Sequence, residues 1–304
     1  MIKIDISLSE LANVKGIGQK TLQRVKEYIG FKNQLENERD VKLQVDQLKT
    51  NIIHNTDNIK GIRQLIPDNS IDLTVTSPPY DNLRDYDDYD FNFKNLAQEL
   101  YRVTKEGGVV VWIVNDATVG GSETGTSFKQ ALYFKEIGFN LHDTMVYQKI
   151  NPIPTALQRY QSCFEYMFIF SKQKPKTINL ITEKCKTAGH VRLTGQRGKN
   201  GTTVNSNSSK KTRKTKPKHN IWKYKIGNNQ TTSDKIAFEH PAIFPEKLVR
   251  DHIKSWSNEG DVVLDPFMGS GTTAKMAKKL NRNYVGFEVS EKYCEIAKER
   301  INNL

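Results

Sequence analysis

Residues 74–80 read Thr-Val-Thr-Ser-Pro-Pro-Tyr, and they continue an apolar run that begins at Ile71 after the turn cluster Pro67–Ser70. Two consecutive prolines remove two backbone N–H donors and fix φ, and the residue before each proline is held extended. The pattern predicts a strand with a rigid tip that offers carbonyl oxygens, the Ser77 hydroxyl and the Tyr80 ring. Such a tip suits a planar ring bearing an amino group, although a proline-rich turn after a buried strand explains the same residues.

Residues 262–272 read Val-Val-Leu-Asp-Pro-Phe-Met-Gly-Ser-Gly-Thr: a short apolar strand, an acid and a glycine-rich turn. A helical segment follows from Thr273 to Leu280, and a further strand from Tyr284 ends on Glu288. Strand, glycine turn and helix form the first unit of a nucleotide-type α/β site, where glycines let the backbone approach a ligand. The spacing fits neither a pyridine dinucleotide motif nor a Walker loop, and Glu288 lies about where a ribose-binding acid is expected.

Together the two stretches resemble the motifs of the S-adenosylmethionine-dependent DNA amino-methyltransferases. Their order, with the catalytic loop before the cofactor loop, resembles the permuted β group of that family, over roughly residues 50–304. The resemblance implies an α/β, Rossmann-like methyltransferase fold: a mostly parallel twisted sheet with an antiparallel hairpin, plus a small N-terminal α-helical unit. In this family the tip is usually Asp-Pro-Pro-Tyr in adenine-N6 enzymes and Ser-Pro-Pro-Tyr in cytosine-N4 enzymes, so Ser77 indicates cytosine.

The resemblance also implies roles for individual residues, with S-adenosylmethionine as the cofactor. Asp265 and the glycine turn are expected to hold its methionine moiety and Glu288 its ribose. Asp57 follows a short strand from residue 51; it is the candidate for the adenine amino group, and it also fits as the cap of a helix that begins at Asn58. The expected catalytic residues are Ser77, Pro78, Pro79 and Tyr80. The expected cofactor-binding residues are Asp57, Phe244, Pro245, Asp265, Pro266, Phe267, Gly269, Ser270, Gly271, Thr272 and Glu288.

Near the N-terminus, two short helical patterns flank Gly16-Ile17-Gly18, and they resemble a helix-hairpin-helix. Such a turn points backbone N–H groups at a phosphate, and Lys15 and Lys20 would add charge. The motif predicts DNA binding without sequence preference. A small helical hairpin that docks on the main domain, or that mediates dimerisation, explains the same pattern.

The chain has 304 residues and a net charge of +12, which suggests a polyanionic partner. Residues 172–225 hold sixteen Lys or Arg against one acid, Glu183. In the resembled family this interval is the target-recognition region, and its composition suits phosphate and base-edge contacts. A disordered basic tether is the alternative, and the two are compatible if the segment orders only on DNA. The expected DNA contacts are Lys15, Gly16, Gly18, Lys20, Arg159, Arg192, Arg197, Lys199, Lys210, Lys211 and Arg213.

Two apolar runs, 145–150 and 164–171, resemble the family's antiparallel hairpin, whose loop helps to seat the flipped base. Phe164-Glu165 stands where family members often have His-Glu, which leaves Arg159 or Tyr160 as base contacts. Earlier in the chain, residues 93–104 read as an amphipathic helix that Gly107-Gly108 ends, followed by a strand over 109–114.

These features predict five segments: a helix-hairpin-helix-like unit (1–32), a connecting helix or linker (33–50), the catalytic half of the methyltransferase domain (51–171), a basic target-recognition region (172–235) and the cofactor-binding half (236–304). Three widely spaced cysteines, Cys163, Cys185 and Cys294, indicate neither a disulfide framework nor a metal site. Without a transmembrane-length run or a signal-peptide pattern, a cytoplasmic enzyme is expected.

The sequence therefore predicts methyl transfer from S-adenosylmethionine to cytosine N4 in duplex DNA, with base flipping and no metal. The expected partners are double-stranded DNA and, functionally, a cognate restriction endonuclease, with the enzyme a monomer or homodimer. Two alternatives from other classes remain: an adenine-N6 or RNA-directed methyltransferase, and a non-catalytic DNA-binding protein that keeps the fold.

Overall fold

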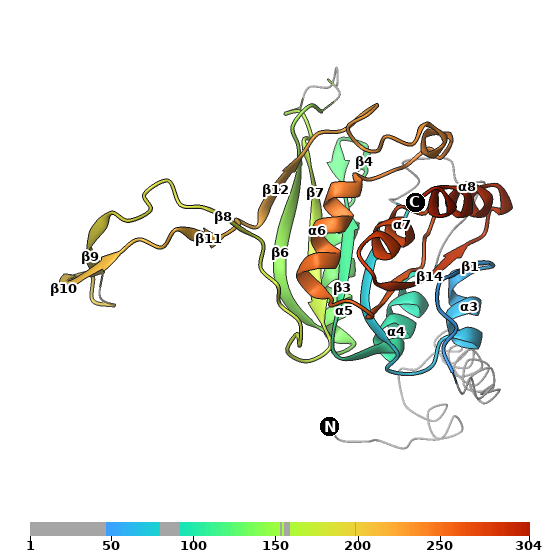
Figure 1. The fold of residues 1–304 in the computed structure, drawn as a ribbon, viewed down its shortest axis with the longest axis horizontal. Coiled ribbons are helices and arrows are strands. Elements are labelled where there is room, and N and C mark those ends of the chain that lie inside the picture. Colours follow the sequence, from blue (N-terminus) through green and yellow to red (C-terminus); the bar gives the residue numbers. More distant parts are fainter. Residues whose placement is uncertain (1–46, 80–91, 153, 155–158, 198) are drawn as a thin grey trace, which may run out of the picture. The chain divides into compact units, whose positions relative to one another are not determined.

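A computed structural model of the chain describes residues 47–79, 92–152, 154, 159–197 and 199–304. The chain divides into two compact units, Met1–Val45 and Asp46–Leu304, and all of the described residues belong to the second (Figure 1). The predicted helix-hairpin-helix lies outside the described residues, with its candidate DNA contacts Lys15, Gly16, Gly18 and Lys20.

The described part of the chain is built on an 8-stranded sheet with the strand order β1-β14-β13-β2-β3-β7-β6-β12. β7 is antiparallel to both of its neighbours, and the other neighbouring pairs in this sheet are parallel. The predicted Rossmann-like sheet with an antiparallel hairpin is thereby confirmed. The strands are β1 (Ile52–Asn55), β2 (Ile71–Thr76), β3 (Thr104–Val114), β6 (Asn140–Lys149), β7 (Phe164–Ser171), β12 (Ile221–Tyr224), β13 (Val262–Asp265) and β14 (Asn283–Glu288).

Helices cover both faces of the sheet, because its central strands are apolar on both sides. Val75 and Val111 belong to the core cluster under α6–α8, whereas Val110 and Trp112 belong to the cluster under α3–α5. This alternation is the two-residue period of a strand. The helices are α3 (Asn58–Leu65), α4 (Phe93–Val103), α5 (Thr126–Glu136), α6 (Glu246–Trp256), α7 (Thr272–Lys279) and α8 (Glu291–Asn302).

The strand order reverses between β2 and β13. From β2 the chain crosses through α4 on one face to β3, and from β13 it crosses through α7 on the other face to β14. The two crossovers lead away from each other, so the carboxyl ends of β2 and β13 mark a topological switch point. Open α/β sheets bind their ligands outside such a point.

An antiparallel ribbon occupies most of the basic interval between β7 and β12. Near its base β8 (Thr182–Lys184) pairs with β11 (Thr215–Pro217), and further out β9 (Val191–Arg197) pairs with β10 (Thr203–Lys211). The structure thus describes most of this interval as a paired ribbon. Short elements complete the described chain: β4 (Thr118–Val119), β5 (Ser122–Glu123) and the 3-10 helix η1 (Lys235–Glu239).

Two local features differ from the sequence-based expectation. Gly107-Gly108 do not end α4: the helix stops at Val103, Thr104 is already extended, and both glycines lie within β3. Gly107 has φ +80°, which accompanies the irregular start of the β2–β3 pairing. At the end of the basic interval, Trp222 is buried and pairs in register with Tyr147, so this end of the interval is the edge strand of the sheet.

Candidate active site

The residues predicted to act together lie at one edge of the sheet. β1, β14, β13 and β2 are parallel neighbours, so their carboxyl ends share that edge. β2 continues into Ser77, β13 ends at Asp265, and β14 ends at Glu288. The fold therefore brings the proline-tipped loop beside the glycine-rich turn, although nearly two hundred residues separate them in the chain.

A buried hydrogen bond joins the two stretches directly. The hydroxyl of Thr76, the last residue of β2, donates to Oδ1 of Asp265 over 2.7 Å, and the backbone N–H of Phe267 donates to the same oxygen over 3.0 Å. Asp265 is 1% exposed. The carboxylate thus fixes the last residue before the Ser77 loop and the first turn after β13.

Burial raises the pKa of Asp265 to about 7, because the interior disfavours the charged carboxylate. The hydrogen bond from Thr76 acts in the opposite direction and favours the ionised form. An acid held at this point changes charge near neutral pH, and a cationic group beside it would favour ionisation. Buried acids with a raised pKa are common at functional sites.

Glu288 holds the other side of the glycine turn. Its Oε2 accepts the N–H of Gly269 over 2.8 Å, and its Oε1 accepts the N–H of Ser290 over 2.9 Å. Burial raises the pKa of this carboxyl as well. A carboxylate has about four acceptor positions, so Glu288 can bind the turn and also accept hydrogen bonds from ligand hydroxyls.

Both glycines of the turn have positive φ values and close neighbours. Gly271 has φ +80°, and a Cβ there would lie 2.6 Å from the Cβ of Ala297 on α8. Gly269 has φ +49°, and a Cβ there would lie 2.9 Å from Nε2 of His240. Left-handed φ values and such close approaches disfavour larger residues, more strongly at Gly271, which meets Ala297, than at Gly269, which meets the end of the His240 ring.

The remaining predicted cofactor contacts lie before α3, before α6 and around the turn. Asp57 caps α3, where its Oδ1 accepts the N–H of Lys60 over 2.9 Å, which confirms the helix-cap interpretation of this residue. Phe244 packs against the core, and the buried Pro245 precedes α6. Four more predicted contacts lie in or beside the turn: Pro266, Phe267, Ser270 and Thr272.

The loop predicted to be catalytic is described as far as Pro79. Pro78 is buried, whereas Ser77 and Pro79 are partly exposed. Tyr80 lies outside the described residues. The loop leaves β2 next to β13 on one side and β3 on the other, with Thr76 paired to Trp112.

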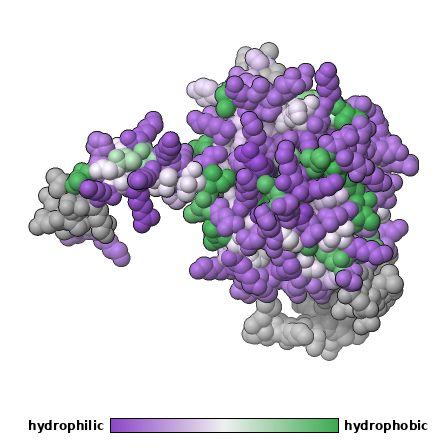
Figure 2. Space-filling view, viewed as in Figure 1, coloured by the Kyte–Doolittle hydropathy of each residue, from purple (hydrophilic) through white to green (hydrophobic). Residues whose placement is uncertain are grey.

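The predicted DNA contacts within the described residues fall into two groups. Arg159 bonds the carbonyl of Gly121 and lies 4.0 Å from Glu123, so it joins the loop before β7 to the β4–β5 hairpin. The others belong to the ribbon, whose pairing places Lys210 opposite Arg192 and Thr203 opposite Arg197. Exposed basic side chains there are Lys199, Lys211 and Arg213. Hydrophilic residues predominate on the face that Figure 2 shows.

Sequence reasoning did not identify two residues that shape the site. Thr76 is one, because its partner depends on which strands are neighbours. Arg300 is the other: its buried guanidinium bonds the carbonyl of Ser270 over 2.5 Å. Its signal was present in the sequence, since Arg300 lies on the same face of α8 as the buried Ile296 and Ala297.

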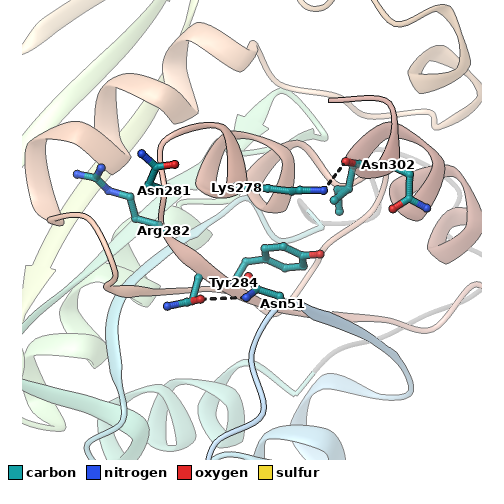
Figure 3. Close-up of a pocket in the computed structure, with 8 residues that line it drawn as sticks. Asn51, Lys278, Asn281, Arg282, Tyr284 and Asn302 are labelled. Carbon is teal, nitrogen blue, oxygen red and sulfur yellow. Dashed lines mark hydrogen bonds between the residues drawn. The ribbon is translucent and has the colours of Figure 1, made fainter.

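A surface pocket of about 550 Å³ lies elsewhere, at the amino ends of β1 and β14 (Figure 3). Asn51 and Asn283 bond each other across it, and Lys278 bonds the carbonyl of Ile301. It is at the opposite edge of the sheet from Asp265, so we do not assign it to the site. Within the described ranges there is no cluster of His, Cys, Asp or Glu that suits a metal ion, and no helix long and apolar enough to cross a membrane.

Comparison with known proteins bears directly on this site. A family model described as DNA methylase (N6_N4_Mtase) matches residues 71–299. The orphan methyltransferase M.BamHII of Bacillus amyloliquefaciens is 58% identical over 245 residues, which cover 80% of this chain and 92% of that protein. The type II methyltransferase M.BglII of Bacillus subtilis is 26% identical over 261 residues, which cover 81% and 68%.

Solved structures share the fold. The cytosine-N4-specific PvuII DNA methyltransferase superposes with a TM-score of 0.60 at 20% identity, covering 85% of this chain and 89% of that one. The M1.HpyAVI–SAM complex gives 0.52 at 23% identity, covering 82% and 98%. The chain belongs to the DNA methylase family of N6 and N4 methyltransferases.

Proposed function

We propose that this protein is a site-specific methyltransferase that modifies the N4 amino group of cytosine in duplex DNA, with base flipping. The observation that carries the proposal is the Thr76–Asp265 hydrogen bond, which sets the Ser77-Pro78-Pro79 loop beside the proposed cofactor turn. A serine in place of aspartate at position 77 is the feature that favours cytosine over adenine.

The loop would act by holding the target amino group. An exocyclic cytosine nitrogen is a weak nucleophile, since its lone pair is delocalised into the ring. The Ser77 hydroxyl and the Pro78 carbonyl would accept hydrogen bonds from the two amino hydrogens and draw the nitrogen toward tetrahedral geometry. Orientation and the fixed dipoles of the loop supply the catalysis, without a covalent intermediate or a strong base.

The described residues around the turn fit S-adenosylmethionine, which supplies an electrophilic methyl group on a sulfonium. The turn with Gly269 and Gly271 lies between the carboxylates of Asp265 and Glu288, and the buried acid Asp265 complements positive charge. Glu288 would accept from the ribose hydroxyls. We assign the methionine moiety to Asp265 and the turn, with Phe244 and Pro245 at its other side. Asp57 would bind the adenine amino group while it caps α3.

A base stacked in duplex DNA cannot reach this loop, so it must leave the helix, and Tyr80 is the proposed stacking partner. The ribbon would neutralise phosphates and read base edges through the target-recognition interval 172–235. Residues 1–32 would add sequence-independent backbone contacts. The proposed methyltransferase domain consists of a catalytic half at 51–171, this target-recognition interval and a cofactor-binding half at 236–304. Residues 33–50 connect it to the N-terminal unit at 1–32.

Mass spectrometry of nucleosides tests the reaction. The protein is expressed in cells that lack DNA methylation, and their DNA is digested and analysed beside a Pro78→Ala control. We expect N4-methylcytosine that is absent from the control. N6-methyladenine instead would reject the interpretation of Ser77 but keep the fold and cofactor. Neither base, with folded protein, would favour RNA substrates or a binding role.

A cognate restriction endonuclease is a separate part of the proposal. Relatives of this chain are described both as an orphan methyltransferase and as type II methyltransferases. Sequencing the genomic neighbourhood and challenging the modified DNA with any endonuclease encoded there would test the pairing. Cleavage of DNA that carries the modification would contradict it.

A further inference from the structure

Four charged side chains meet behind the glycine-rich turn. Arg300 of α8 and Lys275 of α7 are both buried, at 2% and 6% exposure. Arg300 contacts Asp234 and Glu246, each over 2.9 Å. Lys275 contacts the same two carboxylates, over 2.6 and 2.7 Å. Two buried cations and two partly exposed anions thus balance one another.

On one side this cluster holds the turn. Nη1 of Arg300 donates to the carbonyl of Ser270 over 2.5 Å, and lies 3.1 Å from the Ser270 hydroxyl and 3.2 Å from that of Thr272. Its other nitrogens, Nε and Nη2, bond the carboxylates. The planar guanidinium therefore fixes the turn relative to Asp234 and Glu246 in defined directions.

On the other side the cluster holds the segment between β12 and α6. The Thr232 hydroxyl donates to Oε1 of Glu246 over 2.7 Å, and the N–H of Glu246 donates to the carbonyl of Thr231 over 3.0 Å. Glu246 directly follows Phe244 and Pro245, which we assign to the cofactor. The cluster therefore connects both proposed walls of the methionine pocket.

Stability alone gives little reason for such a cluster. Desolvation of buried charges offsets much of their attraction, and well-packed apolar residues are often as stable. What apolar residues cannot do is fix the Ser270 carbonyl and the Glu246 carboxylate at set distances and directions. The geometry, rather than the net energy, distinguishes this arrangement.

We propose that Arg300 is a positioning residue for S-adenosylmethionine: through Ser270 and Glu246 it sets the spacing between the glycine turn and the residues that begin α6. The inference rests on the proposed cofactor site and adds a residue that does not itself touch the ligand.

Titration calorimetry with S-adenosylmethionine, together with steady-state methyl transfer, tests this role in the full chain. Arg300→Lys keeps the positive charge but loses the planar guanidinium and its fixed N–H donors, and Arg300→Gln loses both the charge and the guanidinium. We expect Arg300→Lys to weaken cofactor binding on the order of 10-fold and Arg300→Gln to weaken it more. The KM for the cofactor should rise while kcat changes by less than about twofold, because binding is lost equally in the ground and transition states.

Arg102 provides the matched control. It also bridges carboxylates and carbonyls, with bonds to Glu99, Asp68 and the carbonyl of Ile66, but it lies on the α3–α4 side away from the turn. We expect Arg102→Gln to lower the melting temperature and leave cofactor affinity unchanged. If Arg300→Lys changes only the melting temperature, the positioning role is rejected.

Glu246→Gln covers the case in which the Arg300 variants do not fold. It is isosteric, lies at a partly exposed side chain and removes the charge that Arg300 bonds at the start of α6, so we expect weaker cofactor binding at unchanged kcat. Unchanged affinity in a folded Glu246→Gln variant would overturn the proposal. If the wild-type protein does not bind S-adenosylmethionine, the proposed cofactor site and this inference are rejected together. If the wild-type protein binds it and Arg300→Lys binds it equally well, only the inference is rejected.

Discussion

The hydroxyl of Thr76 donates a 2.7 Å hydrogen bond to the carboxylate of Asp265, across 189 positions of the chain. It ties the strand before the proline-tipped loop to the strand before the glycine turn. Loss of a hydrogen bond to a buried carboxylate costs about 1–3 kcal/mol.

Thr76→Val should therefore lower the free energy of unfolding by about that amount and weaken cofactor binding. Denaturant unfolding and calorimetry at pH 8 measure both effects. Thr74→Val is the control: Thr74 is equally buried on the same strand, and its hydroxyl has no hydrogen-bond partner among the described residues. We expect that control to be neutral, and equal losses in the two variants would contradict the role of the bond.

Asp265 should make cofactor binding depend on pH. Its pKa lies at about 7 in the folded protein, and a cationic ligand favours the ionised carboxylate, so affinity should rise by about tenfold between pH 6 and pH 8. Asp265→Asn should bind the cofactor weakly, and its affinity should not change with pH.

The raised pKa of Asp265 also affects the stability of the fold. The unfolded chain releases this proton near pH 3.8 and the folded chain near pH 7, so this contribution to stability falls as pH rises across that window.

His252 should make the protein sensitive to acid. Burial, with a smaller effect of the Lys218 charge, lowers the pKa of His252 from 6.5 to about 3. Below pH 6.5 the unfolded chain takes up a proton that the folded chain does not, so stability falls as pH decreases toward 3. Melting temperatures between pH 7 and pH 5 should drop less in His252→Phe than in the wild type. His219→Phe alters an exposed ring and should keep the wild-type slope.

Gly271→Ala should damage the turn through a steric clash. Its Cβ would lie 2.6 Å from that of Ala297, whereas at Gly260, with φ +86°, no atom lies within 4 Å of an added Cβ. Gly260→Ala therefore reports the backbone strain alone, at about 1 kcal/mol. The difference between the two variants in denaturant unfolding measures the clash. If Gly271→Ala is no worse than Gly260→Ala and binds cofactor normally, the close approach to α8 is not required.

Ser77→Ala should separate catalysis from cofactor binding. It removes one proposed acceptor for the amino hydrogens, and loss of one such contact costs on the order of 10²-fold in kcat. Affinity for S-adenosylmethionine should stay at the wild-type value. Single-turnover methyl transfer with saturating cofactor measures the step, and a wild-type rate in Ser77→Ala would remove Ser77 from the mechanism.

Much of the fold followed from local patterns. The apolar runs that end at Thr76, Asp265 and Glu288 are strands, because each is short, apolar and followed by a turn signal. Family membership followed from two motifs in order. The prediction that Gly107-Gly108 end a helix is wrong, since glycines that end a helix and glycines that distort the start of a strand look alike in sequence.

The sequence could not show which strands and helices are neighbours in the fold. Thr76 bonds Asp265 only because β13 lies beside β2, and Arg300 reaches Ser270 only because α8 packs behind α7. Both contacts join residues that are far apart in the chain, so neither the helix period nor the strand period predicts them. The roles of Ser77, Asp57 and the ribbon residues stay predictions, which the variants above test.

The ribbon between β7 and β12 has a further consequence. Both flanking strands are locked in register with β6, from Val146 opposite Ile221 to Met145 opposite Met167. Everything between residues 182 and 217 can therefore be lengthened, shortened or replaced without moving the sheet or the loop at Ser77. Under the proposed function, this segment recognises the target sequence and can be exchanged while the catalytic domain stays unchanged. New sequence specificities can then arise by exchange of this insert alone.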